Sequence, residues 1–338
     1  MKVYCGIDLH SNNNVVVLSD EADRVLYRKR LPNELGKVLE ALEPYREQLV
    51  GIAVESTYNW YWLVDGLQAA GYRVHLANTA AMKKYDGLKY ADDSTDAAHL
   101  AHLLRLGILP TGYIYPREER AVRDLGRRRM QLVRSRTMHV LAVENVQARE
   151  TGACMKGDEV KRLNEQAVEA FGLSCDVTLG MQTNVAVIGA LNEQIGRVER
   201  RLLQVLRPRP EYALLCSAPG IARVLGPIIL LETGSIGRFP EVGNYASYAR
   251  CVKSERLTNN KKKGEGNRRN GNKYLAWAYI EAANVAKRSC PQARRFFERK
   301  KARTNGVIAT KALAHKLARA CYHMLKSGER FDMKRCFG

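Results

Sequence analysis

The sequence KVYCGIDL at residues 2–9 is followed at short intervals by NVVVLS at 14–19 and RVLYRKRL at 24–31. The first two stretches are rich in β-branched residues, and polar turns separate all three, which is typical of short strands joined by hairpins. We therefore predict an antiparallel meander of three strands.

Helical and extended patterns alternate after this meander. Leucine and valine recur at helical spacing within 34–48, and an apolar run follows directly. The predicted elements are a helix over 34–48, a strand over 49–54, a helix over 59–70, a strand over 73–77 and a helix over 94–106. This order predicts an α/β domain with a mixed sheet over residues 1–115.

Proline-marked boundaries divide the rest of the chain. After Pro116 the sequence predicts long polar helices over 118–149 and 185–206, which we expect to pair as an antiparallel or coiled-coil arm within 116–207. Residues 151–181 are too mixed to assign. Beyond Pro208 we expect a mainly α-helical domain over 208–338. Its predicted helices are an apolar one ending near 232 and two more at about 273–288 and 307–326.

The charge is unevenly distributed between these parts. The chain has 338 residues with 55 Lys plus Arg and 35 Asp plus Glu, a net charge of +20. Residues 1–115 carry 12 basic and 14 acidic side chains, whereas residues 116–338 carry 43 and 21. A neutral first part joined to a strongly basic remainder favours nucleic acid as the partner. A merely solvated basic surface is the alternative, and no basic amphipathic helix favours a membrane.

Other classes of protein are disfavoured by composition. No apolar run approaches the roughly 20 residues that cross a bilayer, and no signal peptide precedes the first strand, so we expect a soluble, cytoplasmic protein. The 8 cysteines form no C-x-x-C pair, which predicts neither a zinc site nor a disulfide framework.

Acidic residues lie where the predicted strands of the first domain end. Asp8 closes the first strand and Glu55 the fourth, while Asp93 and Asp96 share one face at the start of a later helix. Such carboxylates would repel one another unless a divalent cation, Mg²⁺ or Mn²⁺, neutralised them. Taken singly, each has an ordinary alternative role as a helix cap or a surface charge. Together with the meander, this spacing resembles the ribonuclease-H-like fold of RuvC-type Holliday-junction resolvases.

Features of the basic part indicate phosphate binding. LCSAPGIA at 215–222, followed by an apolar helix, looks like a helix-hairpin-helix turn, although an ordinary packing corner fits equally well. The segment 250–273 contains nine basic and two acidic residues interleaved with glycine and asparagine, as expected of a chain that follows a phosphate backbone. The candidate nucleic-acid-binding residues are Arg127, Arg128 and Arg129 of the arm and Lys253, Arg256, Lys261, Lys262, Lys263, Arg268, Arg269 and Lys273 of this segment. Its hydroxyls, Ser254 and Thr258, are candidate nucleophiles, although phosphate hydrogen bonding is the commoner role.

Four segments carry a resemblance to a known family: GIDLH at 6–10, VESTYNWY at 54–61, LKYADDSTDA at 88–97 and GNKYLAWA at 271–278. They resemble the DEDD transposases of the IS110 insertion-sequence family, most closely its IS1111 subgroup, with Piv-type DNA invertases as relatives. The resemblance implies a RuvC-like domain, a helical arm and a C-terminal transposase domain acting on donor and target DNA. It also implies a structured non-coding guide RNA from the same mobile element.

The resemblance further assigns roles to individual residues. It implies that Asp8, Glu55, Asp93 and Asp96 are the four catalytic metal ligands. The family has a catalytic serine in a stretch that reads TNNKKKG at 258–264 here, so Thr258 takes its place. Threonine carries the same oxygen on a stiffer, branched carbon. The nucleophile is therefore Thr258 in our interpretation, with Ser254 or an impaired copy as alternatives.

These observations support three hypotheses. The first is an RNA-guided transposase or recombinase in which the hydroxyl attacks DNA beside a Mg²⁺ site. Because two duplexes each need two strands cut, it predicts a tetramer or dimer of dimers, working in the bacterial cytoplasm at the nucleoid. The second is a metal-dependent junction nuclease that uses water. The third is a DNA- or RNA-binding protein without catalysis.

Overall fold

The computed structural model describes residues 1–82, 93–253, 256–259, 261–264 and 270–338. The described residues divide into two compact units: Met1–Arg117 together with Asn270, and Glu118–Gly264 together with Gly271–Gly338. The proposed division of the second unit at residues 207 and 208 stays a prediction, because the base of the arm shares a hydrophobic core with the helices that follow it.

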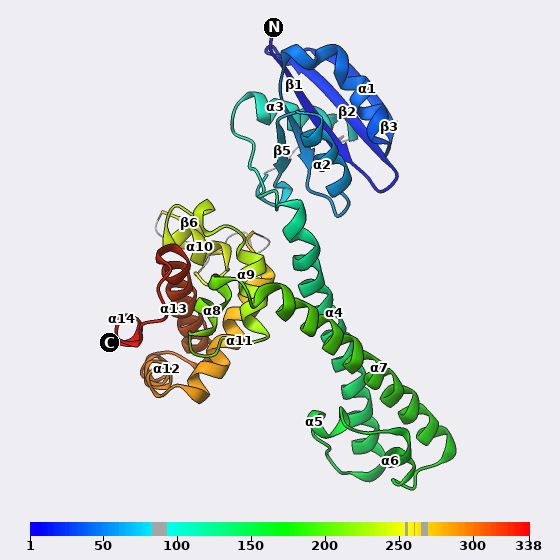
Figure 1. Cartoon of the computed structure of the whole chain (residues 1–338), viewed down its shortest axis with the longest axis vertical. Coiled ribbons are helices and arrows are strands. Elements are labelled where there is room, and N and C mark those ends of the chain that lie inside the picture. Colours follow the sequence, from blue (N-terminus) through cyan, green and yellow to red (C-terminus); the bar gives the residue numbers. More distant parts are fainter. Residues whose placement is uncertain (83–92, 254–255, 260, 265–269) are drawn as a thin grey trace. The chain divides into compact units, whose positions relative to one another are not determined.

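A mixed five-stranded sheet forms the centre of the first unit (Figure 1). Its strands are β1 (Val3–Leu9), β2 (Asn13–Asp20), β3 (Val25–Pro32), β4 (Leu49–Glu55) and β5 (Val74–Ala77), in the order β3-β2-β1-β4-β5. The first three pair antiparallel, whereas β4 is parallel to β1 and β5 is parallel to β4. The predicted meander and mixed sheet are confirmed.

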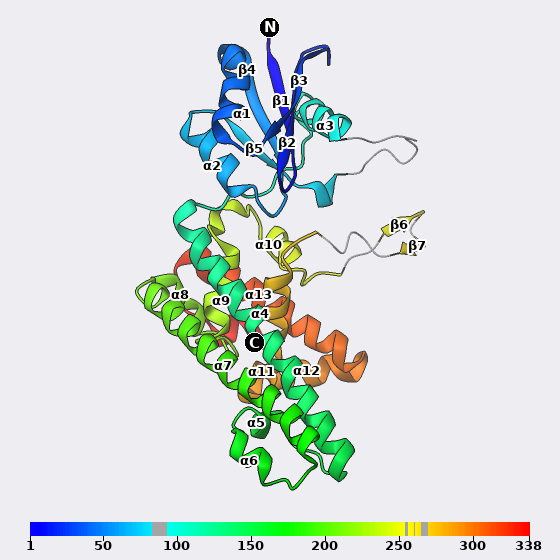
Figure 2. The same cartoon turned by 90° about the vertical axis from the view of Figure 1, so that its right-hand side faces the viewer.

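Helices cover both faces of this sheet (Figure 2). On one face, Ile7 and Val54 form a core with α1 (Leu35–Leu42) and α2 (Tyr61–Ala69). On the other face lies α3 (Asp93–Arg105), whose buried Ala97 packs on β2 and whose buried Leu100 packs on β4 and β5. Side chains alternate between the faces of a strand, so Gly6 and Asp8 point toward α3.

One predicted helix of this unit is shorter than expected. The helix predicted over 34–48 ends as α-helix at Leu42, and a 3-10 helix, η1 (Glu43–Gln48), continues to β4. Pro44 stands at the start of this second turn. Proline has no N–H to continue the α-helical hydrogen bonds, which explains the change.

Two long helices form the arm of the second unit, α4 (Arg117–Thr151) and α7 (Cys175–Leu206). They run antiparallel, since residues increasingly late in α4 bond to residues increasingly early in α7. The pairs are Arg129 with Glu199, Arg136 with Asn192 and His139 with Asn184. The short helices α5 (Gly157–Val160) and α6 (Glu165–Glu169) close the tip around a small core of their own (Figures 1 and 2). The predicted antiparallel arm is confirmed, and α7 starts ten residues earlier than predicted.

The remaining helices of the second unit enclose a larger core in which Tyr245 and Tyr279 are fully buried. They are α8 (Pro210–Cys216), α9 (Leu225–Thr233), the 3-10 turn η3 (Ile236–Arg238), α10 (Val242–Tyr248), α11 (Lys273–Ser289), α12 (Pro291–Arg303), α13 (Gly306–Ser327) and α14 (Met333–Phe337). The sequence did not predict α10, α12 and α14. For α12 the reason is its composition, because only Ala293 and Phe297 among its 13 residues are buried. Among the described helices, none combines the length and apolar character needed to span a membrane.

A small hairpin interrupts the helices in the basic segment. Its strands are β6 (Arg256–Thr258) and β7 (Lys261–Gly264), which pair antiparallel. Asn259 takes a positive φ of 49° in the turn, a conformation that asparagine tolerates better than most residues. This hairpin was not predicted, because glycine, asparagine and lysine have low strand propensity.

Candidate active site

Asp8 and Glu55 end two neighbouring parallel strands. The register pairs Ile7 of β1 with Val54 of β4, and each acidic residue is the next one along its strand. Residues at the carboxyl ends of parallel strands lie at the edge where α/β proteins assemble their sites. Asp8 is buried, with 3% of its surface exposed, and Glu55 is half-buried.

The first unit brings three ligand-type side chains together at this edge. The Nε2 atom of His10 lies 3.2 Å from Oδ2 of Asp8 and 3.3 Å from Oδ2 of Asp93. One ligand atom from each of the three residues lies within 4.8 Å of the others. Of the predicted ligands, Asp8 and Asp93 therefore meet, and they are joined by His10, which was not among the predicted ligands. The available signal was its place two residues after Asp8, just beyond the end of β1.

The backbone around His10 is held from two sides. Its carbonyl oxygen accepts hydrogen bonds from the side-chain amides of Asn33, at 3.0 Å, and Asn59, at 2.8 Å. These two residues follow β3 and β4, respectively. The backbone of His10 is therefore held by the segments that follow β3 and β4.

Arg30 contributes the nearest described cation to this cluster. Its Nη2 donates to Oδ2 of Asp93 at 2.5 Å. This hydrogen bond, together with the charges of Arg30 and His10, holds the pKa of Asp93 below its usual range. Asp93 is therefore ionised at neutral pH and able to act as a ligand.

The cluster has the donor set that a divalent cation requires. Nε2 of His10 is buried and makes no hydrogen bond, because neither carboxylate oxygen meets hydrogen-bond geometry despite its proximity. A neutral imidazole nitrogen and two carboxylate oxygens that converge in this way can all bind one cation. One imidazole nitrogen and two carboxylate oxygens suit Mn²⁺, and the carboxylates suit Mg²⁺. The residues present therefore fit a divalent metal.

The other two predicted ligands lie near this cluster without joining it. Among the described residues, no group of mutually close ligand atoms includes Glu55 or Asp96. Asp96 is half-buried, one helical turn after Asp93 on α3. Both keep their predicted place at the same sheet edge, and their role as ligands stays a prediction.

Two contacts fix α3, which carries Asp93 and Asp96. A Cβ atom on Gly6 of β1 would lie 1.9 Å from the carbonyl oxygen of Ala97, so the strand and helix backbones touch. At the far end of α3, Arg105 donates to Asp23 at 2.6 and 2.8 Å, and His102 lies 2.9 Å from it. The Arg105 hydrogen bond is the main cause of a lowered pKa of Asp23.

The predicted nucleophile lies in the second unit. Thr258 ends β6, is paired with Lys261 across the hairpin, and is exposed. Ser254, the alternative nucleophile, lies outside the described residues. The hairpin thus presents one hydroxyl next to lysine residues, which is compatible with phosphate binding or with attack on a phosphate.

The predicted basic residues of the segment are only partly described. Lys253, Lys261, Lys263 and Lys273 are exposed. Arg256 and Lys262 lie on the hairpin strands, but their side chains are outside the described part. Arg268 and Arg269 fall outside it altogether. A role of these residues in nucleic-acid binding stays a prediction.

The arginines of the arm are largely engaged within the second unit. Arg127 donates to buried Glu232 of α9 at 2.6 and 2.8 Å, and Arg129 bonds to Glu199 of α7. Burial alone would lower the pKa of Arg127, but the hydrogen bonds and charge of Glu232 outweigh it and raise that pKa. Arg128 is exposed and bonds only locally, to Gln131. Of the three, Arg128 is therefore the one most available to a nucleic acid.

Glu232 also anchors the chain that follows the basic segment. Asn272 donates to it at 2.7 Å and caps α11 by accepting from the backbone N–H groups of Tyr274 and Leu275. The residue before it, Gly271, has a positive φ, and a Cβ there would lie 2.6 Å from the carbonyl oxygen of Tyr248. The C-terminal end of the basic segment, at Gly271 and Asn272, is thus fixed in place.

The turn predicted as a helix-hairpin-helix element joins α8 to α9. Gly220 has a φ of 80°, and a Cβ on it would lie 2.1 Å from the carbonyl oxygen of Ala282 in α11. This glycine is therefore required for close packing between helices. A phosphate contact at the same turn stays a prediction.

Comparison with known families gives two matches. Residues 5–146 match the model of the DEDD transposases of IS110, described as Transposase. Residues 212–298 match the model described as Transposase IS116/IS110/IS902 family. The first match contains Asp8, His10, Glu55, Asp93 and Asp96, and the second contains Thr258. No curated protein sequence matches the chain.

Proposed function

Because this chain belongs to the IS110 family of DNA transposases, we propose that it cuts and rejoins DNA strands through a hydroxyl of its own, beside a metal held by its acidic residues. The observation that carries this proposal is the cluster of buried Asp8 with half-buried His10 and Asp93, in which a ring nitrogen lies within 3.3 Å of two carboxylate oxygens. In the proposal the first unit is RuvC-like, and Glu55 and Asp96 complete the ligand set on substrate binding.

The proposed strand transfer conserves phosphodiester bonds. Oγ1 of Thr258 loses its proton and bonds to a DNA phosphorus, while the bond from that phosphorus to one DNA oxygen breaks. The DNA hydroxyl released, or one from a second strand, then attacks the protein-linked phosphate and restores Thr258. A bound Mg²⁺ or Mn²⁺ would stabilise the charge that develops on the phosphate oxygens. The chain's residues hold the ions and the strands in place for both steps.

The charge of the chain supports two polyanionic partners. Residues 116–338 carry 22 more basic than acidic side chains. We propose that this surface holds donor and target DNA together with a structured guide RNA, as the family resemblance implies. Cutting both strands of two duplexes requires four active sites, so the proposed working form is a tetramer built as a dimer of dimers, acting at the nucleoid in the cytoplasm.

A covalent adduct tests the nucleophile. The wild-type protein incubated with target DNA, its co-purified RNA and Mg²⁺ should give an SDS-resistant protein–DNA band. Thr258→Ala should abolish this band, whereas Thr258→Ser should retain it, because serine supplies the same oxygen with fewer steric restrictions. Thr183→Ala, at an exposed threonine of α7, is the matched control.

One observation favours a second candidate, the junction nuclease that uses water. Thr258 stands where the family resemblance implies serine, and a branched nucleophile is harder to align. Cleavage by Thr258→Ala at the wild-type rate, with no adduct in either protein, would establish water as the nucleophile. Sequencing of the co-purified RNA tests the guide: one defined structured species supports it, and degraded cellular RNA alone contradicts it.

A further inference from the structure

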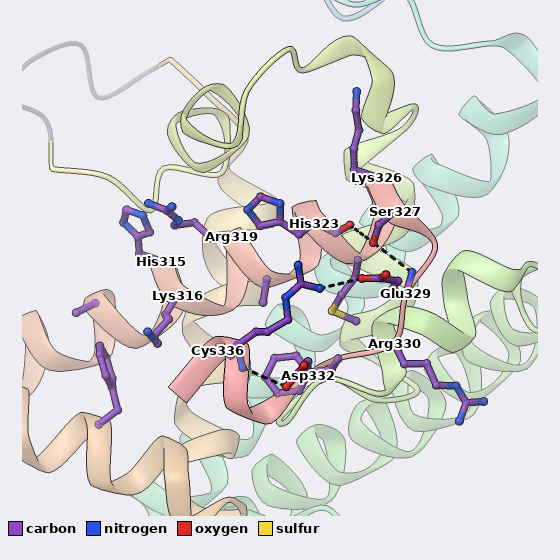
Figure 3. A pocket seen from close by; sticks show the side chains of 16 residues that line it. His315, Lys316, Arg319, His323, Lys326, Ser327, Glu329, Arg330, Asp332 and Cys336 are labelled. Carbon is purple, nitrogen blue, oxygen red and sulfur yellow. Dashed lines mark hydrogen bonds and ion pairs between the residues drawn. The ribbon is translucent and has the colours of Figure 1, made fainter. Parts of the chain in front are cut away.

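A pocket on α13 lies apart from the hairpin and has no role in the strand transfer proposed above. Its volume is about 740 Å³, and it is lined by one face of α13, by Phe296 of α12 and by the segment that leads into α14 (Figure 3). His315, Arg319 and His323 follow one another on that face at intervals of four residues, as neighbours on one side of a helix must. Apart from Phe296, the lining residues lie beyond both family matches.

The positive charge of this pocket is not balanced within it. Its two acidic residues are engaged: Glu329 pairs with Arg335 at 2.9 Å, and Asp332 caps α14 by accepting two backbone N–H groups. In the part of the chain that the structure describes, no carboxylate lies within ion-pair distance of the remaining lining cations. These cations are Lys316, Arg319, Lys326 and Arg330. Uncompensated cations at a concave surface attract an anion.

The same pocket also offers apolar surface. Phe296, Met324 and Phe331 line it. The ammonium group of Lys316 lies 5.2 Å from the centre of the Phe296 ring, so charge and apolar surface adjoin. Partial burial, with a smaller effect of Arg319, lowers the pKa of His315. A neutral imidazole can both donate and accept hydrogen bonds.

We propose that this pocket binds an unpaired nucleotide of a nucleic-acid strand, with its phosphate at Arg319 and Lys316 and its base against Phe331. Cations beside an aromatic surface are the combination that single-stranded nucleic acid requires. A duplex would present its phosphates to the rim and keep its bases out of the pocket. The volume lies within the range of pockets that hold small ligands. The proposal rests on the proposed function, which supplies both RNA and DNA as strands.

Two pocket variants and one control test this proposal. Arg319→Glu removes the phosphate contact at an exposed position, and Phe331→Ala removes the base contact at a half-buried one. Lys311→Glu, exposed on α13 outside the pocket, makes the same change of charge as Arg319→Glu. Circular dichroism melting confirms that each variant is folded. The probes are fluorescein-labelled single-stranded RNA, single-stranded DNA and duplex DNA of about 12 nucleotides.

Fluorescence anisotropy at one fixed salt concentration gives the affinities. Both pocket variants should weaken binding of a single strand by about tenfold, with duplex binding changed no more than in Lys311→Glu. The strand that loses more affinity, RNA or DNA, is the source of the nucleotide. Equal losses in Arg319→Glu and Lys311→Glu, or an equal loss for duplex, would overturn the proposal.

Photo-crosslinking locates the nucleotide directly. A single strand containing 4-thiouridine or 4-thiothymidine should crosslink to wild-type peptides within 315–331, and Phe331→Ala should lose that crosslink. Crosslinks confined to other parts of the chain would overturn the proposal. The Thr258 adduct assay is independent of this crosslink. An adduct without the crosslink would contradict only the proposal for the pocket. The crosslink without an adduct would contradict only the covalent mechanism.

Discussion

The two regions that carry the proposed chemistry are built in opposite ways. In the first unit Asp8 is buried and its partners His10 and Asp93 are half-buried, and backbone contacts, two asparagine side chains and an ion-paired helix end position them. In the second unit Thr258 is exposed on a short hairpin, and the hydrogen bond that fixes the basic segment lies at its C-terminal end, at Asn272. The fold therefore preorganises the metal ligands, and it leaves the nucleophile to be positioned by what binds it.

The largest expected effect is the loss of catalysis when buried Asp8 loses its charge. Asp8→Asn keeps the shape of the side chain and removes a ligand charge, so we expect strand cleavage to fall by at least about a hundredfold. The measurement is the rate of cleavage of a labelled DNA target, with electrophoretic mobility shift as the binding control. Unchanged cleavage in Asp8→Asn would contradict a catalytic role for Asp8 and its metal site.

A second prediction concerns Glu232, which holds the C-terminal end of the basic segment. Glu232→Gln leaves Arg127 without its counter-charge and weakens the bond to Asn272. Breaking a buried pair costs about 3–5 kcal/mol, and because the Arg127 side chain is partly exposed we expect the lower end of that range. Urea unfolding should show this loss of free energy of unfolding. Glu298→Gln, in an exposed pair with Lys301 at 3.9 Å, should change it by less than about 0.5 kcal/mol. Equal losses of free energy of unfolding in the two variants would mean that the contacts of Glu232 do not stabilise the fold.

A third prediction tests the contact between β1 and α3. Gly6→Ala forces the helix away from the strand, and overpacking of this kind costs about 1–3 kcal/mol. It should also weaken metal binding, measured by calorimetry with Mn²⁺, because Asp93 moves with α3. Gly36→Ala, in α1 with open space around it, should instead leave metal binding unchanged and stabilise the chain by up to about 1 kcal/mol.

The smallest expected effect concerns pH and the far end of α3. The pKa of Asp23 in the folded chain is lowered, chiefly by the Arg105 hydrogen bond. Its contribution to the free energy of unfolding is therefore present above the pKa of the unfolded chain, and it is lost as the pH falls through the pKa of the folded chain. Asp23→Asn should therefore lower the urea midpoint at pH 7. On acidification below about pH 4, this variant should lose less of its free energy of unfolding than the wild type does. Parallel losses in both proteins would exclude this role for Asp23.

The sequence predicted the sheet better than the contacts of its charged residues. Alternation and β-branched residues predict β1 to β4 because burial imposes those patterns. Asp8 could be found because it closes a strand. For His10 the sequence offered only its place two residues after Asp8, because its backbone is held by Asn33 and Asn59, which come from distant segments.

The same limit applies to the second unit. Arg127 and Arg129 look like any basic helix surface in sequence, and only the fold shows that Glu232 and Glu199 occupy them. α12 escaped prediction because two buried residues suffice to hold it. Patterns along the chain report burial, whereas ion pairs depend on which elements meet.

The contact between Gly6 and Ala97 separates two properties that usually change together. Because the spacing of strand and helix is set by one backbone against another, substitutions among the neighbouring core side chains can alter the stability of the unit while the distance between Asp8 and Asp93 stays the same. Substitutions of core side chains are therefore compatible with the geometry of this site, whereas a substitution of Gly6 is not.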